Sequence, residues 1–265
     1  MRLGDSKIEG KIWAVAPAAG VGRRMNASVP KQYLYLGGET VLERTLKRLL
    51  SVVQIERIVV PVASHDNRWS GFDIFQHPNI ETCIGGEERV HSVLSGLRYL
   101  RKIAGPEDWV LVHDIARPCV RRTDIEKLIQ SSLCSGVGGI LAARVSDTLK
   151  RARTDMDCTD TDDSTDSADT DSTAEISATI DRTQIWRAFT PQMFPLVELQ
   201  HALERALADG ELVTDEASAM ELLGQAPKLV PGAVDNIKIT ESADLQFAEM
   251  ILELQEQAEC QETQK

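Results

Sequence analysis

Residues 15–32 have the side chains and spacing that could do chemistry. An apolar run ends here in small residues, among them Gly20 and Gly22, and a polar stretch follows. That stretch holds three cations, Arg23, Arg24 and Lys31. Small residues let backbone N–H groups approach an anion closely, and cations neutralise charge that amides alone do not balance. The segment therefore predicts a loop that holds a nucleoside triphosphate.

Two better-known phosphate loops do not fit this segment. A dinucleotide fingerprint needs a third glycine where Met25 stands, and a Walker loop needs Lys and Ser or Thr after Gly22, where this chain has two arginines. An ordinary glycine-containing turn between a strand and a helix is the plain alternative. The arginine pair and the tripeptide Pro-Lys-Gln at 30–32 favour the triphosphate loop over that turn.

Strands and amphipathic helices that could position this loop alternate along the chain. Apolar runs predict strands at 11–16, 57–63, 81–84, 108–112 and 137–145, with short strands at 229–230 and 236–240. Helical spacing predicts helices after 40, at 90–100, at 197–208 and at 243–254, while 66–78 gives no assignable signal. Capping boxes are predicted at Thr40 with Glu43 and at Thr123 with Glu126, and Thr214 is predicted to cap a further helix.

This alternation predicts an α/β fold with a mostly parallel, doubly wound sheet. Such a sheet places ligands beyond the carboxyl ends of its strands. The loop at 15–32, the glycines at 85–86 and the residues that follow 112 all lie at such ends. We therefore expect these three segments to meet at one site.

Several separated motifs closely resemble the 2-C-methyl-D-erythritol 4-phosphate cytidylyltransferases of the non-mevalonate isoprenoid pathway. The first is Pro-Ala-Ala-Gly-x-Gly-Arg-Arg-Met at 17–25, followed by Pro-Lys-Gln. The others are Gly-Gly-x-x-Arg at 85–89, His-Asp-x-Ala-Arg-Pro at 113–118, Asp-Thr-x-Lys at 147–150, Ile-Asp-Arg at 180–182, Thr-Pro-Gln at 190–192, Thr-Asp-Glu-Ala at 214–217 and Asp-Asn-Ile-Lys at 235–238. The resemblance covers about 13–254. Ile115 stands where the family has a small residue, and Glu87 where it usually has Asp.

The resemblance implies a single Rossmann-like nucleotidyltransferase domain that transfers CMP from CTP to 2-C-methyl-D-erythritol 4-phosphate. A phosphate oxygen would attack the α-phosphorus and expel pyrophosphate, so the protein supplies positioning and electrostatic stabilisation. Mg²⁺ would be the cofactor, bridging phosphate oxygens. Three alternatives stay open: a ribitol-5-phosphate cytidylyltransferase, a protein that binds CTP without turnover, and a nicotinamide-dependent oxidoreductase.

By resemblance, the functional side chains fall into three groups. The catalytic residues are Arg24, Lys31 and Lys238. The nucleotide-binding residues are Ala18, Ala19, Gly20, Gly22, Gly86, Glu87 and Ser92. The substrate-binding residues are Asp114, Arg117, Thr148, Arg182, Thr190 and Lys238, with Asp114 also the metal ligand. His113 is predicted to be structural, because the phosphate nucleophile is already ionised.

The domain is predicted to span 11–254, with flexible termini at 1–10 and 255–265. By resemblance, 148–182 forms a protruding β-arm that reaches across a homodimer, so that Thr148 and Arg182 complete the partner subunit's site. An insertion rich in Asp, Thr and Ser at 154–179 is predicted to be a mobile loop, because it lacks apolar surface to bury. The chain ends soon after its last predicted helix, so fusion to the later cyclase of the pathway is not expected.

Composition limits the partners and the compartment. The formal net charge of -12 over 265 residues disfavours nucleic acid and anionic membranes as partners. No apolar run is long enough to span a bilayer, and the five cysteines are scattered without metal-ligand spacing. These features predict a cytoplasmic protein with reduced thiols.

Overall fold

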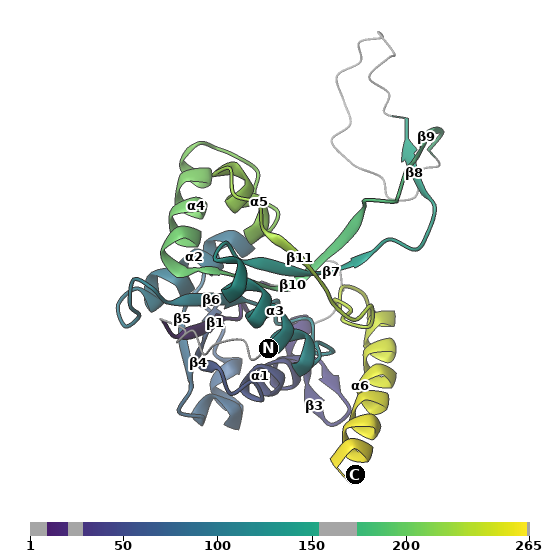
Figure 1. Ribbon diagram of the computed structural model, residues 1–265. Coiled ribbons are helices and arrows are strands. Elements are labelled where there is room, and N and C mark those ends of the chain that lie inside the picture. Colours follow the sequence, from purple (N-terminus) through teal and green to yellow (C-terminus); the bar gives the residue numbers. More distant parts are fainter. Residues whose placement is uncertain (1–9, 21–28, 154–173, 264–265) are drawn as a thin grey trace, which may run out of the picture. The chain divides into compact units, whose positions relative to one another are not determined.

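The computed structural model describes residues 10–20, 29–153 and 174–263 (Figure 1). The chain divides into two compact units. The main unit comprises the described residues up to 143 and from 188, and the arm unit comprises those from 144 to 187. The predicted site residues Gly22 and Arg24 lie outside the described residues.

A seven-stranded sheet forms the centre of the main unit, in the order β11-β7-β10-β6-β1-β4-β5. β1 pairs in parallel with β4 and β6, whereas β10 runs antiparallel to β6. The predicted doubly wound, mostly parallel sheet is thus confirmed. Its strands are β1 (Ile12–Val15), β4 (Ile55–Val62), β5 (Ile80–Ile84), β6 (Trp109–Val112), β7 (Gly139–Arg144), β10 (Trp186–Pro195) and β11 (Lys228–Pro231), and a separate hairpin joins β2 (Tyr35–Leu36) to β3 (Glu39–Thr40).

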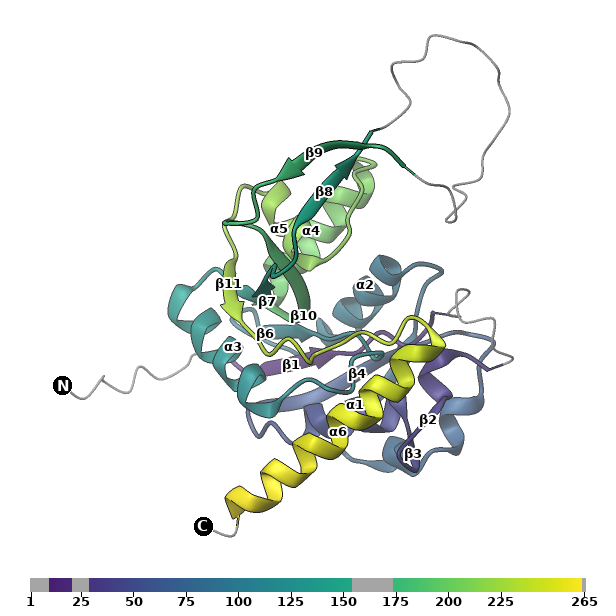
Figure 2. The same cartoon turned by 90° about the vertical axis from the view of Figure 1, so that its right-hand side faces the viewer.

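Helices cover both faces of this sheet (Figure 2). Ala14 of β1 belongs to the core cluster that includes Leu42 and Leu46, whereas the next residue, Val15, faces Gly96 on the opposite side. A methyl group on Gly96 would lie 2.7 Å from Val15, so close packing needs glycine here. One face carries α1 (Val41–Leu50), α3 (Arg122–Ser135) and α6 (Ser242–Thr263), and the other carries α2 (Arg89–Leu100), α4 (Leu196–Ala208) and α5 (Glu216–Leu222).

Two of the predicted helix starts need correction. The box at Thr40 and Glu43 is confirmed, since each residue accepts a hydrogen bond from the other's backbone N–H group. The box at Thr123 is wrong, because α3 already begins at Arg122 and leaves Thr123 inside its first turn. The cap of α5 is Asp215 and not Thr214, because the Asp215 carboxylate accepts from the Ser218 N–H.

The chain after β11 also differs from expectation. Residues 236–240 form no strand but run along the main unit, with the Ile239 N–H donating to the Ala116 carbonyl at 2.8 Å. α6 continues to Thr263, so residues 255–263, predicted to belong to a flexible end, form the last turns of a helix. Gln255 is buried, and its Nε2 donates to the Cys119 carbonyl at 3.0 Å.

Two 3₁₀ helices occupy the stretch 66–78, which sequence leaves unassigned. They are η3 (Arg68–Gly71) and η4 (Asp73–Gln76), and a further one, η2, spans Lys31–Tyr33. None of the helices within the described ranges combines the length and apolar character that crossing a membrane requires.

The arm unit contains two antiparallel strands. β8 (Leu149–Ala152) pairs with β9 (Ile176–Ile180), in the segment expected to form an arm. Residues 176–179 therefore belong to a strand and not to the predicted mobile insertion. Within the rest of that insertion, residues 154–173 lie outside the described residues.

Candidate active site

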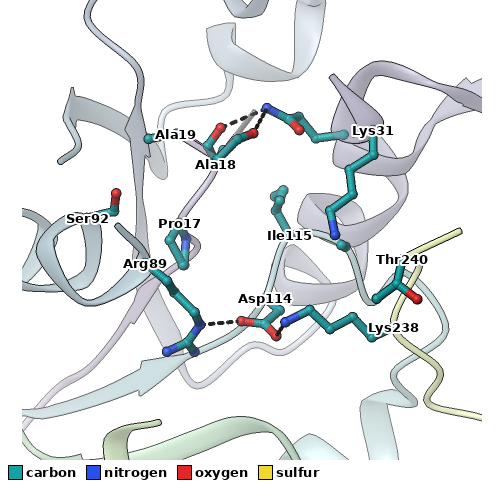
Figure 3. A pocket seen from close by; sticks show the side chains of 13 residues that line it. Pro17, Ala18, Ala19, Lys31, Arg89, Ser92, Asp114, Ile115, Lys238 and Thr240 are labelled. Atoms are coloured by element: carbon teal, nitrogen blue, oxygen red, sulfur yellow. Dashed lines mark hydrogen bonds and ion pairs between the residues drawn. The ribbon is translucent and has the colours of Figure 1, made fainter. Parts of the chain in front are cut away.

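A cavity of about 570 Å³ opens where the carboxyl ends of β1 and β6 meet the segment that precedes α6 (Figure 3). Its volume lies in the range of small-molecule sites. Seven predicted site residues line it, namely Ala18, Ala19, Gly20, Lys31, Ser92, Asp114 and Lys238. The topology thus brings together residues more than two hundred positions apart, as the doubly wound sheet predicts.

The segment after β1 is held from behind by Gln32. This buried amide donates through Nε2 to the carbonyls of Ala18 (2.9 Å) and Gly20 (3.2 Å). The Ala18 N–H is already used, since it donates to the Pro61 carbonyl at 2.8 Å. The amides of Ala19 and Gly20 have no acceptor within the part of the chain that the structure describes. These two N–H groups of the segment can therefore donate hydrogen bonds to a bound anion.

The second glycine turn packs against this segment. A methyl group on Gly85 would lie 2.7 Å from the Ala19 methyl and 2.9 Å from the Ser92 hydroxyl, so the close approach requires glycine. The Ser92 hydroxyl accepts from the Gly86 N–H and donates to the Gly86 carbonyl, both at 3.1 Å. Ser92 therefore fixes the turn, while Glu87 is exposed and is not part of the cavity lining.

Asp114 lies among three cations, of which Figure 3 shows Arg89 and Lys238. Its Oδ1 accepts from Arg89 Nε at 2.7 Å, its Oδ2 contacts Lys238 Nζ at 2.8 Å, and Arg117 Nε lies 3.7 Å from Oδ2. Burial alone would raise the pKa of the Asp114 carboxyl, but Arg89 and Lys238 outweigh burial and hold that pKa well below its usual range. The carboxylate therefore stays ionised at neutral pH.

The backbone at Asp114 is fixed by a buried pair, His113 and Thr190. The Asp114 N–H donates to the Thr190 hydroxyl at 3.0 Å, and that hydroxyl lies 3.1 Å from His113 Nδ1. The other ring nitrogen, Nε2, lies 3.1 Å from the Arg117 carbonyl, which can only accept. Nε2 is therefore assigned the proton, and Thr190 donates to Nδ1. Burial lowers the pKa of His113 to about 4, so the ring is neutral and structural, as expected.

Lys31 reaches the cavity from the opposite rim. Its ammonium donates to the Ile239 carbonyl at 2.9 Å, which ties η2 to the segment that carries Lys238. Asp244 at the start of α6 accepts from the backbone N–H groups of Thr240 and Glu241, which shapes the same segment.

Not every predicted site residue reaches the cavity. Gly86, Arg117 and Thr190 are close to it but do not line it; Arg117 Nη1 donates to the Asn236 carbonyl at 2.7 Å. Thr148 and Arg182 belong to the arm unit, where Arg182 Nη1 donates to the Ser146 carbonyl. Their roles stay predictions.

Sequence reasoning assigned no role to Arg89 or Gln32, which both shape the cavity. The signals were present: Arg89 ends the Gly-Gly-x-x-Arg motif and opens α2, and Gln32 ends Pro-Lys-Gln. Ile115, where the family has a small residue, also lines the cavity and is buried.

Cations outnumber anions among the lining residues. Lys31, Arg89 and Lys238 face a single carboxylate, Asp114. Together with the amides of Ala19 and Gly20, which have no acceptor among the described residues, this charge excess suits a polyanion such as a triphosphate or a phosphate ester.

Comparisons with known proteins agree with this chemistry. The chain matches the family model described as IspD, 2-C-methyl-D-erythritol 4-phosphate cytidylyltransferase, over residues 12–167 and 164–254. It is 44% identical over 242 residues to the enzyme of that name from Yersinia pseudotuberculosis, covering 91% of this chain and 92% of that one. It is 47% identical over 239 residues to that of Vibrio vulnificus, covering 90% and 93%.

Solved structures are similar as well. A 4-diphosphocytidyl-2C-methyl-D-erythritol synthase aligns with a TM-score of 0.74 and 32% identity, over 92% of this chain and 99% of that one. The Francisella tularensis 2-C-methyl-D-erythritol 4-phosphate cytidylyltransferase aligns with a TM-score of 0.72 and 32% identity, over 91% and 100%.

Proposed function

Since the chain belongs to the 2-C-methyl-D-erythritol 4-phosphate cytidylyltransferase family, we propose that the cavity beside β1 and β6 binds both of its substrates. The enzyme transfers CMP from CTP to 2-C-methyl-D-erythritol 4-phosphate, giving 4-diphosphocytidyl-2-C-methyl-D-erythritol and pyrophosphate. A phosphate oxygen of the polyol bonds to the α-phosphorus, and the bond from that phosphorus to the bridging oxygen breaks. Pyrophosphate leaves with the electron pair. The observation that carries the assignment to this cavity is the convergence of three cations beside the amides of Ala19 and Gly20, which have no acceptor among the described residues.

The nucleotide half of the site is assigned to the segment after β1 and the turn at Gly86. The amides of Ala19 and Gly20 would bind phosphate oxygens, and Lys31 would exchange the Ile239 carbonyl for the triphosphate. Charge that develops on the phosphate oxygens in the transition state is then stabilised by cations already in place. Arg24 and Gly22, which the resemblance adds to this half, lie outside the described residues.

The polyol half is assigned to Asp114 and Lys238. Lys238 is the more exposed partner of their ion pair, with 37% of its side chain accessible against 9% for Asp114. The lysine can therefore turn towards a phosphate ester, while Asp114 stays held by Arg89 and accepts from polyol hydroxyls. Arg117, held close by on Asn236, extends the cationic surroundings of this half.

A divalent cation is the proposed cofactor, and Mg²⁺ fits the donor set. The described residues include no group of three or more His, Cys, Asp or Glu side chains that could hold a metal by themselves. Mg²⁺ is commonly bound through one or two carboxylates plus substrate phosphates. The Asp114 carboxylate retains lone pairs beyond those that Arg89 and Lys238 use, so it could be that ligand. The bound ion would neutralise charge on the triphosphate.

The arm unit is proposed to serve a partner subunit in a homodimer. Thr148 and Arg182 are exposed residues flanking the paired strands β8 and β9. If they complete the partner's site, mixing the inactive chains Arg182→Ala and Lys31→Met restores one intact site in each mixed dimer. Random mixing then returns about a quarter of the wild-type activity, because half the dimers are mixed and each has one intact site of two. No recovery, with mixed dimers shown by mass, would refute the shared site.

Pyrophosphate release tests the function and the site together. Wild-type enzyme, CTP and Mg²⁺ are assayed with 2-C-methyl-D-erythritol 4-phosphate and, separately, ribitol 5-phosphate. We expect turnover with the former, and Lys31→Met should lower kcat about 10²–10³-fold, as removal of an oxyanion-stabilising group does. Lys47→Met, which removes a surface lysine paired with Glu39, is the matched control and should leave kcat unchanged.

Other outcomes are informative. Faster turnover of ribitol 5-phosphate would overturn the polyol assignment, and stabilisation by CTP without pyrophosphate release would indicate a binding protein. Full activity in Lys31→Met would remove this lysine from the catalytic site.

A further inference from the structure

Arg89 is shared between two carboxylates, of which only one faces the cavity. Its Nε donates to Asp114 at 2.7 Å, while Nη1 and Nη2 bind the two oxygens of Glu216 at 2.7 and 3.0 Å. We propose that Glu216 is a positioning residue, which acts through Arg89 to hold Asp114 in the orientation that the polyol phosphate needs. This inference rests on the proposed role of Asp114 in substrate binding.

Glu216 is itself fixed in place. It is the first residue of α5 and is 1% exposed. Gln192 on β10 ties down the start of this helix, since its Nε2 donates to Asp215 and its Oε1 accepts from the Ala217 N–H. A buried carboxylate must have a compensating partner, and Arg89 supplies it with a bidentate contact. The guanidinium is thus anchored to a rigid point of the fold.

Glu216 does not line the cavity, whereas Arg89 and Asp114 do. Both oxygens of Glu216 are held by Arg89, so Arg89 is the side chain that links Glu216 to the cavity. The guanidinium is planar and its donors form a rigid fork, so fixing two nitrogens on Glu216 also fixes the direction of the third. That third nitrogen, Nε, is the one that meets Asp114.

Charge gives the arrangement a second effect. Burial opposes the charged form of Arg89, but Glu216 and then Asp114 raise the pKa of the guanidinium above its usual value. Without the Glu216 charge, Arg89 could turn both outer nitrogens onto Asp114 and draw that carboxylate away from Lys238. Glu216 therefore divides the hydrogen bonds of Arg89 so that Asp114 receives one of them and keeps its contact with Lys238.

A double-mutant cycle between Glu216→Gln and Asp114→Asn tests this coupling in the full chain. The measured quantity is the affinity of 2-C-methyl-D-erythritol 4-phosphate, by calorimetry, with the enzyme saturated by a non-hydrolysable CTP analogue. Glu216→Gln should weaken this affinity about 10–100-fold, the range expected when a hydrogen bond to a charged group is lost, and change the affinity for the CTP analogue less than about 3-fold. In the Asp114→Asn background, the same substitution should add less than about 3-fold, since its target is gone.

The matched control is Glu204→Gln. Glu204 on α4 pairs with Arg98 of α2 at 3.0 Å on the surface. It therefore links two helices on the same face of the sheet as Arg89 without touching Asp114. This variant should bind both ligands as wild type does. If Glu216→Gln fails to fold, Glu216→Asp keeps the charge but is too short for the bidentate contact, and it should weaken polyol binding by an intermediate amount.

A merely structural ion pair would give different results. Glu216→Gln would then lower the melting temperature but leave the affinity of the folded protein for the polyol phosphate unchanged. Alternatively, it would weaken that affinity by the same factor in the Asp114→Asn background as in the wild type. Either result overturns the proposal. A crystal structure of Glu216→Gln tests it even if the substrate proves to be another polyol phosphate. Unmoved Arg89 and Asp114 side chains there would refute the positioning role.

Discussion

Replacing Asp114 by Asn should destabilise the fold, because it removes the carboxylate that Arg89 and Lys238 share at the cavity. The amide has nearly the same shape as the carboxylate, so packing is kept and the charge is lost. Arg89 and Lys238 would then stay within 2.8 Å of a neutral group. Asn can accept from one of them through Oδ1, while its Nδ2 must face the other.

The expected cost follows from burial. Removing one partner of a buried ion pair costs about 3–5 kcal/mol. Asp114 is 9% exposed at its side chain and Arg89 29%, but Lys238 is 37% exposed and its attraction is screened by water. We therefore expect the lower end, about 3 kcal/mol of unfolding free energy. For a chain of this size that corresponds to a fall in Tm of roughly 6–12 °C.

Urea unfolding at several pH values separates this charge effect from a packing defect. The Asp114 pKa is held below its unfolded value of about 3.9, so its stabilisation is fully present above that pH and is lost as pH falls towards the folded pKa. The difference in unfolding free energy between wild type and Asp114→Asn should be constant from pH 8 to 5 and shrink below about pH 4. His113 titrates in both proteins and cancels to first order.

Two results would refute the reasoning. A difference below about 1 kcal/mol at pH 7 would mean that water already screens the three cations from Asp114. A difference of the expected size that stays constant down to pH 3 would indicate lost packing or hydrogen bonds and not lost charge.

Three further predictions concern the residues around the cavity. Gln32→Met leaves two carbonyls behind the nucleotide segment without their donor, so CTP titrations should show about 10-fold weaker binding, roughly 1.4 kcal/mol. His113→Gln should reduce the loss of stability on acidification: between pH 7 and 4.5 the wild type should lose about 2 kcal/mol more in urea unfolding, because folding lowers the pKa of the histidine from its unfolded value to about 4. Gly85→Ala puts a methyl group 2.7 Å from Ala19 and should weaken CTP binding about 10-fold, whereas Gly105→Ala, with its nearest neighbour at 3.5 Å, should not.

Sequence predicts the sheet well, because its strands are signalled locally. Buried parallel strands are apolar on both faces, and β1, β6 and residues 58–62 of β4 all read as continuous apolar runs. The carboxyl ends of such strands lie at one edge, so the proximity of the Gly20 and Asp114 segments follows from topology alone.

Helix starts are harder to predict from sequence than strands, because the residue spacing of a capping box can also occur by chance within a helical turn. Thr123 and Glu126 have the spacing of a box, yet α3 begins at Arg122 and Glu126 instead pairs with Arg122 at 3.2 Å. Residues 236–240 are predicted to form a short strand and do alternate polar with apolar side chains, but the structure shows no ladder there. Ile239 is buried while Lys238 faces the cavity, so the alternation reflects two environments and not strand pairing.

The pairing of Arg89 with Glu216 could not be predicted from pattern. The two residues are 127 positions apart, and each stands at the start of a helix, where a charged residue is unremarkable. Only the packing of α2 near α5 brings them together. The role of Gln32 could not be predicted either, because its partners are backbone carbonyl groups, which any residue type carries.

The contact between Lys31 and the Ile239 carbonyl joins residues 208 positions apart. During synthesis, the segment after β1 leaves the ribosome long before residues 238–240, which complete the cavity. A nascent chain that stops short of Asn236 holds both glycine turns and Asp114, but it lacks Lys238 and the carbonyl that anchors Lys31. Translation must therefore pass residue 239 before the contacts that anchor Lys31 and pair Lys238 with Asp114 can form.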